Sequence, residues 1–243
     1  MKTIYGVGLG TVALACAVTA SMPSKRVMAQ GVATPEMQVP AIREPHHFVK
    51  LDNKYARVLD VTVAPFSGTL YHIHENPYFW ISIGPATLRG QTLGAKEIIN
   101  IEPVDAEVRY SPVITHRVGN IGSTLFRNIT VQIQARDDVS PGAAFLASPT
   151  PAGYQAKPAF DNELVRVERL ILEPGQSTGR YTVPRSGLLI AAHDGSISVE
   201  RPGTSAHRVE MKAGEFEWHT GPITHTITNI GKTRFEAIEA VWK

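Results

Sequence analysis

Two histidines separated by one residue, His72-Ile73-His74, are the strongest candidates for chemistry in this sequence. On a β-strand the side chains at positions i and i+2 project from the same face, so these two imidazoles can point together into the interior of a barrel. A metal site needs at least one more ligand, and it must come from another strand. We take His116, which follows His74 by 42 residues, as that third ligand.

Three neutral imidazoles suit Fe(II), Mn, Ni, Cu or Zn, and they leave coordination positions open for water, substrate or dioxygen. The alternative is that the site holds no metal. The sequence shows no nucleophile elbow, phosphate-binding loop or paired-carboxylate motif, so it offers no local alternative to metal chemistry. We therefore predict a divalent transition metal at His72, His74 and His116.

An internal repeat sets the organisation of the chain, and its offset is 109 residues throughout. Because the offset never changes, no net insertion separates the early matches from the late ones. Ordered matches at one offset indicate a duplication. The matching segments are Asp52-Asn53 and Asp161-Asn162, Arg57-Val58 and Arg166-Val167, Ile114-Thr115-His116 and Ile223-Thr224-His225, and Asn120-Ile121-Gly122 and Asn229-Ile230-Gly231.

Each copy of the repeat has the pattern of an all-β domain. Short β-prone runs alternate with turns rich in Gly and Pro, and no stretch has the periodicity of a sustained helix. Several short strands in each ~80–100 residues favour a sandwich or a jelly roll. Residues 136–160, rich in Pro, Ala and Gly, are typical of a linker between the copies. The expected strands include residues 57–63, 125–133, 165–172, 187–192 and 235–242.

The first 29 residues have the features of an export signal. Lys2 gives a positive start, a mostly apolar run follows, and small-residue cleavage patterns end at Ala20 and at Ala29. A membrane anchor is the alternative, although the run is marginal for spanning a bilayer. Cys16, the single cysteine, lies in a sequence that resembles a lipoprotein acylation site. We expect cleavage, a periplasmic or secreted location, and no stable membrane span afterwards.

Removal of the signal changes the charge and the cysteine content. Residues 1–29 contain Lys2, Lys25 and Arg26 and no acidic residue, so their loss takes the formal net charge from +2 to −1. No basic stripe remains to attract a phosphate backbone, so we expect no nucleic-acid partner. Without a cysteine the mature chain forms no disulfides, and its metal ligands must be His or oxygen. A content of 43% hydrophobic and 19% charged residues is typical of a globular protein.

The surroundings of these histidines resemble the two motifs of the cupin superfamily. The first cupin motif has a Gly, five residues, His-x-His, three or four residues and a Glu. The second has a Gly eleven residues before a His, which is followed by three residues and an Asn. Residues 65–74 match the first motif with Phe66 at the usual Gly, and His116 with Asn120 matches the end of the second. In the second copy Gly214, His225 and Asn229 match the second motif.

The resemblance covers about residues 46–243. It implies two tandem double-stranded β-helix barrels of the jelly-roll type, called barrel 1 (residues 46–135) and barrel 2 (residues 161–243) from here on. The chain then resembles a bicupin with an export signal.

Barrel 1 departs from the cupin pattern at the glutamate. Where the family has Glu, four or five residues after His74, this chain has Tyr78 and Phe79. Glu75 is adjacent to His74 and would face away on a regular strand. The site thus resembles the three-histidine minority of cupins, which includes thiol and diketone dioxygenases. Loss of the carboxylate leaves more positive charge on the metal, which favours an anionic substrate; the alternative is a decaying site.

Barrel 2 has lost the paired histidines. At the repeat offset His72 corresponds to Tyr181 and His74 to Val183, and only His225 persists, with His219 six residues before it. We expect barrel 2 to hold no metal and to support barrel 1. Whether His219 and His225 share a pocket is left open.

The resemblance implies a metal-dependent enzyme, either a dioxygenase or an isomerase or lyase, that acts on a small anionic or enolisable molecule. Glu75 and Tyr78 are guesses for a general base. The alternatives are a non-catalytic exported protein that binds a ligand or a metal, and a structural module that pairs chains into homodimers. We also expect the aromatic residues near the motif either to line the pocket or to belong to the core (Tyr71, Tyr78, Phe79 and Trp80). Arg57 and Arg166 recur at the repeat offset, and we expect each to form a structural ion pair. His46 and His47 either close the mouth of barrel 1 or lie in a solvated tail.

Overall fold

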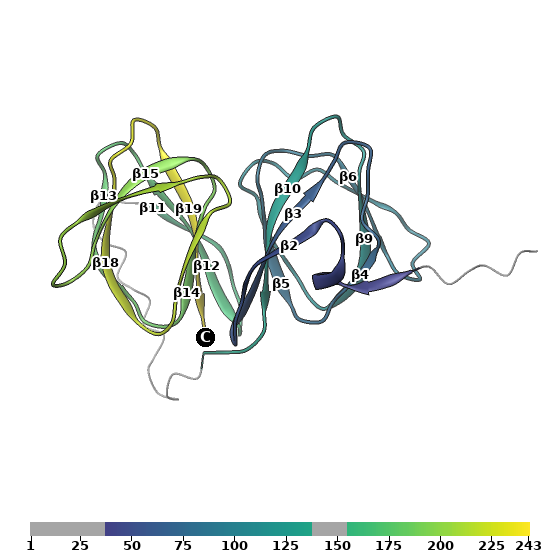
Figure 1. Ribbon diagram of the computed structural model, residues 1–243, viewed down its shortest axis with the longest axis horizontal. Helices are drawn as coiled ribbons and strands as arrows, with labels where there is room; N and C mark the ends of the chain where they lie inside the picture. Colours follow the sequence, from purple (N-terminus) through teal and green to yellow (C-terminus); the bar gives the residue numbers. More distant parts are fainter. Residues whose placement is uncertain (1–36, 138–154) are drawn as a thin grey trace, which may run out of the picture. The chain divides into compact units, whose positions relative to one another are not determined.

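The structure, a computed structural model, describes residues 37–137 and 155–243 (Figure 1). The expected signal peptide, residues 1–29, and residues 138–154 of the expected linker lie outside the described residues. Within the described part the chain is almost entirely β, as predicted, with one short 3-10 helix, η1 (Ala41–Arg43). No helix in this part is long and apolar enough to cross a membrane.

The first half of the described chain forms two five-stranded sheets that face each other. Sheet A has the order β1 (Gln38–Pro40), β4 (Tyr71–His74), β9 (Ile114–Asn120), β6 (Leu88–Thr92), β7 (Ile99–Ile101). Sheet B has the order β2 (His47–Asp52), β3 (Ala56–Val63), β10 (Phe126–Ile133), β5 (Tyr78–Ser82), β8 (Val108–Ser111). These sheets make barrel 1.

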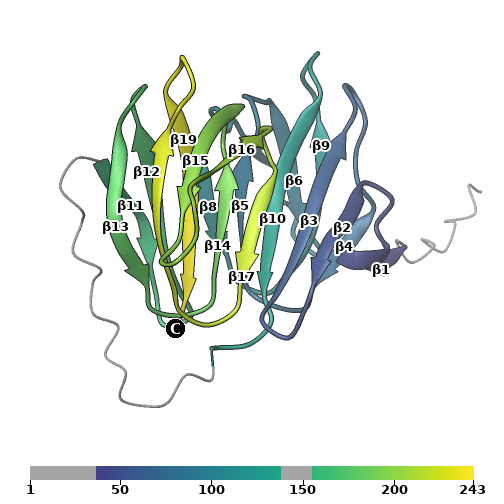
Figure 2. The ribbon, with the colours of Figure 1, turned by 60° about the vertical axis from the view of Figure 1, so that its left-hand side comes forward.

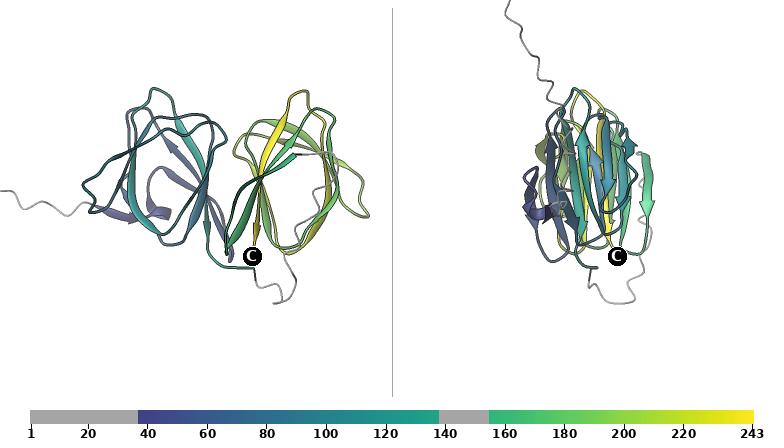
Figure 3. Two further views of the ribbon diagram at one scale, coloured as in Figure 1. Left: turned by 180° about the vertical axis from the view of Figure 1, so that it is seen from behind. Right: turned by 90° about the vertical axis from the view of Figure 1, so that its right-hand side faces the viewer.

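The second half repeats this arrangement. Sheet C has the order β11 (Gln155–Asp161), β12 (Val165–Leu172), β19 (Phe235–Trp242), β14 (Gly187–Ala191), β17 (Phe216–His219). Sheet D has the order β13 (Ser177–Val183), β18 (Ile223–Asn229), β15 (Gly195–Glu200), β16 (His207–Met211). Figure 3 shows each half closing on itself as a barrel.

The duplication inferred from the sequence is visible in the hydrogen bonds. Asn120 donates from Nδ2 to the carbonyls of Val63 and Thr124. Asn229, 109 residues later in the sequence, donates in the same way to Leu172 and Thr233. Each asparagine also accepts a hydrogen bond from the glycine two residues on. Each asparagine therefore holds the turn that follows its strand.

A hydrophobic core is built from the strand faces of sheets B and C that point away from the two barrel interiors. It fixes strands that lie side by side in Figure 2, β3 with β10 and β12 with β19. Burial of apolar side chains on both sheets is the main stabilising contribution here. Its members are Ala56, Val58, Phe79, Ile81, Ile129, Val131, Ile133, Val165, Val167, Leu188, Ile190, Ile238, Ala240 and Trp242.

The N-terminal boundary and the linker differ from the expectation. Barrel 1 begins before residue 46, because β1 pairs in parallel with β4, with Val39 opposite His72. The linker expected to reach residue 160 is already strand β11 from Gln155. Pro158 favoured a linker because proline is rare inside strands. However, β11 is an edge strand with a register shift between Pro158 and Phe160, and such positions tolerate proline.

Candidate metal centre

Two neighbouring strands of sheet A bring the three predicted histidines together. His72 and His74 lie on β4, and His116 lies opposite His72 on β9 in antiparallel register. One ring nitrogen from each histidine can be chosen so that all three atoms lie within 4.8 Å of one another. The ring centroids are 4.5 Å apart for His72 and His116, 5.0 Å for His72 and His74, and 5.2 Å for His74 and His116.

Burial keeps these imidazoles neutral, which is the form that binds a metal. His72 and His74 are each 2% exposed. Desolvation, followed by the proximity of the other histidines, lowers the pKa of His74 far below its usual range and that of His116 to about 3. Desolvation also lowers the pKa of His72. The three rings therefore offer lone pairs to a cation at neutral pH.

One nitrogen in this group has an unmet need for a partner. The Nε2 atom of His116 is buried and has no hydrogen-bond partner among the described residues. A buried polar atom without a partner is destabilising unless something else satisfies it. A cation held by the three imidazoles would do so, and an all-imidazole donor set is appropriate for a first-row transition metal. The residues present thus fit the metal that the sequence predicted; its binding stays a prediction.

Contacts on the far side of the rings orient two of the histidines. Nδ1 of His72 lies 3.0 Å from the carbonyl of Leu70, and Nδ1 of His74 lies 3.2 Å from the side-chain amide of Gln132. The Leu70 carbonyl accepts the Nδ1–H of His72, which leaves the Nε2 lone pair of that ring for the centre of the group, whereas the amide N–H of Gln132 donates to Nδ1 of His74. Arg57 reaches the oxygen of the same amide at 3.5 Å and pairs with Asp52 at 3.0 Å. The expected ion pair of Arg57 is therefore present. Arg57 also helps to hold the Gln132 amide that contacts His74.

His47 does not lie in a solvated tail, one of the two environments expected for it from the sequence. It lies on β2, is 8% exposed, and sits edge-on to His72 with 4.6 Å between ring centroids. Its Nδ1 atom lies 2.8 Å from the carbonyl of Ala41. Desolvation, and then the nearby His72, lowers its pKa to about 4. Only an adjacent pair of histidines, His46-His47, hinted at this role, and nothing in their spacing placed them near the motif.

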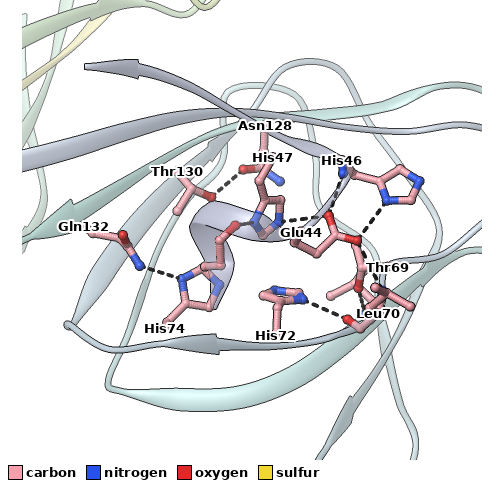
Figure 4. Close-up of polar contacts among 12 residues, drawn as sticks. Glu44, His46, His47, Thr69, Leu70, His72, His74, Asn128, Thr130 and Gln132 are labelled. Atoms are coloured by element: carbon pink, nitrogen blue, oxygen red, sulfur yellow. Dashed lines mark hydrogen bonds and ion pairs between the residues drawn. The ribbon is translucent and has the colours of Figure 1, made fainter. Parts of the chain in front are cut away.

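Glu44 is a second residue without a sequence signal. Its side chain is fully buried and accepts hydrogen bonds from the backbone N–H of His46 at 2.7 Å and of Leu70 at 3.2 Å (Figure 4). Nδ1 of His46 lies 3.0 Å from Oε1 of Glu44, the oxygen that also accepts the hydrogen bond from Leu70. Burial alone would raise the pKa of this carboxyl, but the contacts with His46 and His47 outweigh burial and lower it. A buried carboxylate therefore lies beside the histidines.

Tyr78 and Phe79 stand where the first cupin motif has its glutamate, and both lie on β5. Tyr78 stacks on His74, with 4.0 Å between ring centroids and 19° between planes, and burial raises its pKa. Phe79 points to the other side of sheet B, into the core shared with sheet C. Glu75 follows the last residue of β4 and is exposed. Among the described residues no carboxylate joins the three-histidine group.

The histidines open onto a cavity of about 220 Å³ inside barrel 1. Tyr78 and Trp80 line it, whereas Tyr71 and Phe79 do not. Tyr71 is instead buried with the guanidinium of Arg117 over its ring at 4.7 Å. The expectation that some of these aromatics line the pocket is therefore met by two of the four. The remaining lining is mostly apolar and is considered below.

Barrel 2 has a polar interior at the corresponding place but little space. Tyr181, at the position of His72, donates a hydrogen bond to Glu239 at 2.8 Å, and complete burial raises the pKa of that carboxyl to about 7. Nε2 of His225 is buried without a hydrogen-bond partner among the described residues. His219 and His225 do line one pocket, but its volume is only about 20 Å³, room for one water molecule.

Comparison with known proteins gives structural likeness only. No family model and no curated protein matches the sequence. Among solved structures, the chain is similar to oxalate decarboxylase from Bacillus subtilis (TM-score 0.55, 11% identity, 78% of this chain and 69% of that one). It is also similar to salicylate 1,2-dioxygenase from Pseudaminobacter salicylatoxidans (TM-score 0.57, 10% identity, 80% and 75%).

A third solved structure is a cupin 2 conserved barrel domain protein from Leptotrichia buccalis (TM-score 0.51, 12% identity, 81% of this chain and 88% of that one). At such identities the likeness concerns the fold. Taken with the paired sheets of each half, these comparisons show that the chain has the cupin fold, present twice in tandem.

Proposed function

We propose that this protein binds one divalent transition metal through His72, His74 and His116 and uses it to transform a small anionic or enolisable molecule. The observation that carries the proposal is the convergence of three neutral imidazoles, two buried and one half-buried, on one side of a cavity large enough for a substrate. Fe(II), Mn, Ni and Zn are all compatible with this donor set. The reaction would be that of a dioxygenase, or of an isomerase or lyase.

When bound, the metal would supply Lewis acidity or a site for dioxygen at its open positions. The chain's own residues do the rest. The three histidines add no negative charge to the site, so an anionic group is attracted to it. The apolar lining excludes water from most of the cavity, which strengthens that attraction. Leu70 and Gln132 fix the orientation of two rings by their contacts with Nδ1.

The proposed location is outside the cytoplasm, in the periplasm or the medium. Its support is the sequence of residues 1–29 alone. Detection of the mature N-terminus by mass spectrometry would test it, because cleavage after Ala20 or Ala29 gives different masses and acylation at Cys16 gives a third.

Elemental analysis of the purified protein tests the metal directly. We expect about one metal per chain in the wild type after reconstitution, and loss of it in His72→Ala and in His116→Ala. The matched control is His207→Ala, because His207 is exposed on β16 and should not affect the metal content. A wild-type protein that stays empty, or variants that keep their metal, would overturn the proposal.

A non-catalytic binding protein is the second candidate. The observation in its favour is that no Asp or Glu among the described residues lines the cavity, so no carboxylate base faces a bound molecule. Besides the histidines and Arg109, the titratable lining residues are Tyr78 and Tyr110, and burial raises the pKa of Tyr78. Thermal stabilisation of the metal-loaded protein by a ligand that is recovered unchanged would favour binding over catalysis.

A further inference from the structure

The cavity beside the histidines is much larger than a metal ion and its waters require. At about 220 Å³ it exceeds the space that one water molecule needs by roughly an order of magnitude. The histidines occupy only one part of its wall. The shape and chemistry of the remaining wall therefore decide what kind of molecule reaches the metal.

That remaining wall is mainly apolar. A group of aliphatic and aromatic side chains from both sheets lines it, and the polar lining residues other than the histidines and aromatics are neutral, with one exception. Of these, Thr130 donates to Asn128 at 2.7 Å, so the two already satisfy each other in part. The apolar group consists of Val61, Val63, Leu88, Ile99, Ile101, Ile114, Val118 and Phe126.

The exception is Arg109, the single charged residue other than histidine in the lining formed by the described residues. Its Nε atom donates to Glu107 at 2.6 Å, and its guanidinium lies 5.7 Å from the centroid of the Trp80 ring. Glu107 thus offsets the charge of Arg109. A second anionic group on a ligand would find no free cation there, and burial of an unpaired charge is strongly unfavourable.

Barrel 2 shows that this space results from the choice of side chains. At the repeat offset of 109, Leu170 stands at the position of Val61 and Ile227 at that of Val118. Both belong to the apolar core that fills barrel 2. One additional methylene at each position, together with other changes, accompanies a cavity of about 20 Å³ in place of about 220 Å³. At these two positions Val61 and Val118 leave space that a larger side chain would fill.

We propose that the barrel 1 cavity selects a carboxylate, or a comparable monoanion, with an aromatic or branched apolar body. The acidic group would lie at the metal and the body against Val61, Val63 and Val118. This rests on the proposed metal site and narrows its substrate class: short polar acids, and acids with a second charge far from the metal, are disfavoured. The apolar body gains by leaving water, whereas a second charge at its far end meets only apolar side chains and an arginine already paired with Glu107.

The test compares three probes on the metal-loaded protein by isothermal titration calorimetry: acetate, benzoate and terephthalate, whose second carboxylate lies too far from the first to bind the same metal ion. We expect benzoate to bind at least about tenfold more tightly than acetate, since it buries far more apolar surface. We expect the preference to shrink in Val118→Ile and in Val61→Leu, which carry the residues found in barrel 2. The matched control is Ile227→Val, which makes the opposite change in barrel 2 and should leave the preference intact.

Metal content, measured on the same samples, separates the two proposals. A protein without metal after reconstitution overturns the proposed function and this inference with it. A loaded protein that binds acetate or terephthalate at least as tightly as benzoate overturns the inference alone. Unchanged benzoate binding in both filled variants, each shown to be folded by circular dichroism, also overturns it.

Discussion

Oε2 of Glu44 lies 4.0 Å from Nε2 of His47. The Glu44 side chain has no exposure, and the His47 ring packs edge-on against His72. Desolvation lowers the pKa of His47 and of His72, and attraction to the Glu44 carboxylate opposes part of that lowering. The segment between η1 and β2 thus places a buried anion beside His47 and near His72, although it does not join the three-histidine group.

Substitution of Glu44 by Gln should weaken metal binding. The change removes a negative charge close to the histidines with little change in size, and residues that support metal ligands typically contribute about 10–100-fold in affinity. Competition with a chromophoric chelator measures this directly. Because the loss of charge leaves the metal more positive, a bound anion such as azide should bind more tightly in Glu44→Gln.

A merely structural effect of Glu44→Gln would weaken both the metal and the anion. The matched control is Glu75→Gln, because Glu75 is exposed beside His74 and should change neither affinity. Equal affinities in the wild type and Glu44→Gln would show that the carboxylate has no electrostatic role at the metal.

The metal-free protein should lose stability as the pH falls from 7 to 5. The pKa values of His47 and His225 are lowered to about 4 and that of His116 to about 3, each first of all by desolvation. In this range the unfolded chain binds more protons at these sites, so the free energy of unfolding decreases by up to about 1.4 kcal/mol per pH unit for each group.

One group acts in the opposite direction. Complete burial raises the pKa of Glu239 to about 7, so the folded protein binds a proton at pH 5 that the unfolded chain binds more weakly. Three histidines outweigh one carboxyl, and the net loss on acidification remains. Urea unfolding at pH 7 and pH 5 checks the sign, and His116→Gln should flatten the dependence whereas His207→Gln should not. Stability that rises on acidification would contradict this account.

Replacement of Arg127 by Lys should lower the free energy of unfolding by about 1–3 kcal/mol. Arg127 forms two hydrogen bonds with Asp60, at 2.9 and 3.0 Å, and donates a third to the carbonyl of Ala213 at 2.8 Å. An ammonium group cannot reproduce this planar set of contacts. Arg208→Lys is the control, because that pair with Glu210 is largely exposed. Equal losses in both variants would argue against a special role for Arg127.

Replacement of Asn120 by Ala should be about as destabilising as replacement of Asn229 by Ala, roughly 2–4 kcal/mol each. Each side chain is almost fully buried and makes the same three hydrogen bonds. Chemical denaturation of both variants, with the exposed Asn100→Ala as reference, measures the effect. A small loss at either position would mean that the turn is held mainly by other contacts.

The sequence predicted the parts of the site that obey a short-range rule. His72 and His74 share a strand face by alternation, and the repeat pointed to the strand of His116. Glu44 and His47 follow no such rule. They reach the site because β1 pairs with β4 and the chain then turns through η1, and pairing between distant segments leaves no local pattern in either of them.

The two-sided burial of β3 explains another limit. Its burial does not alternate simply between buried and exposed residues, because Val61 and Val63 face the barrel interior while Ala56 and Val58 face sheet C. The strand was predicted, but a run that is apolar on both faces does not reveal what covers the second one. The contact between sheets B and C was therefore not foreseen beyond the expectation that barrel 2 supports barrel 1.

That second face of sheet B also has a consequence for oligomerisation. A polypeptide that stopped after β10 would present Phe79, Ile129 and Val131 to water, and the simplest remedy would be another molecule of the same kind. In this chain sheet C covers that face, and because both barrels belong to one polypeptide this cover does not depend on protein concentration. The outer face of barrel 2 has to match sheet B, whereas its interior is under no such constraint and carries no histidine pair.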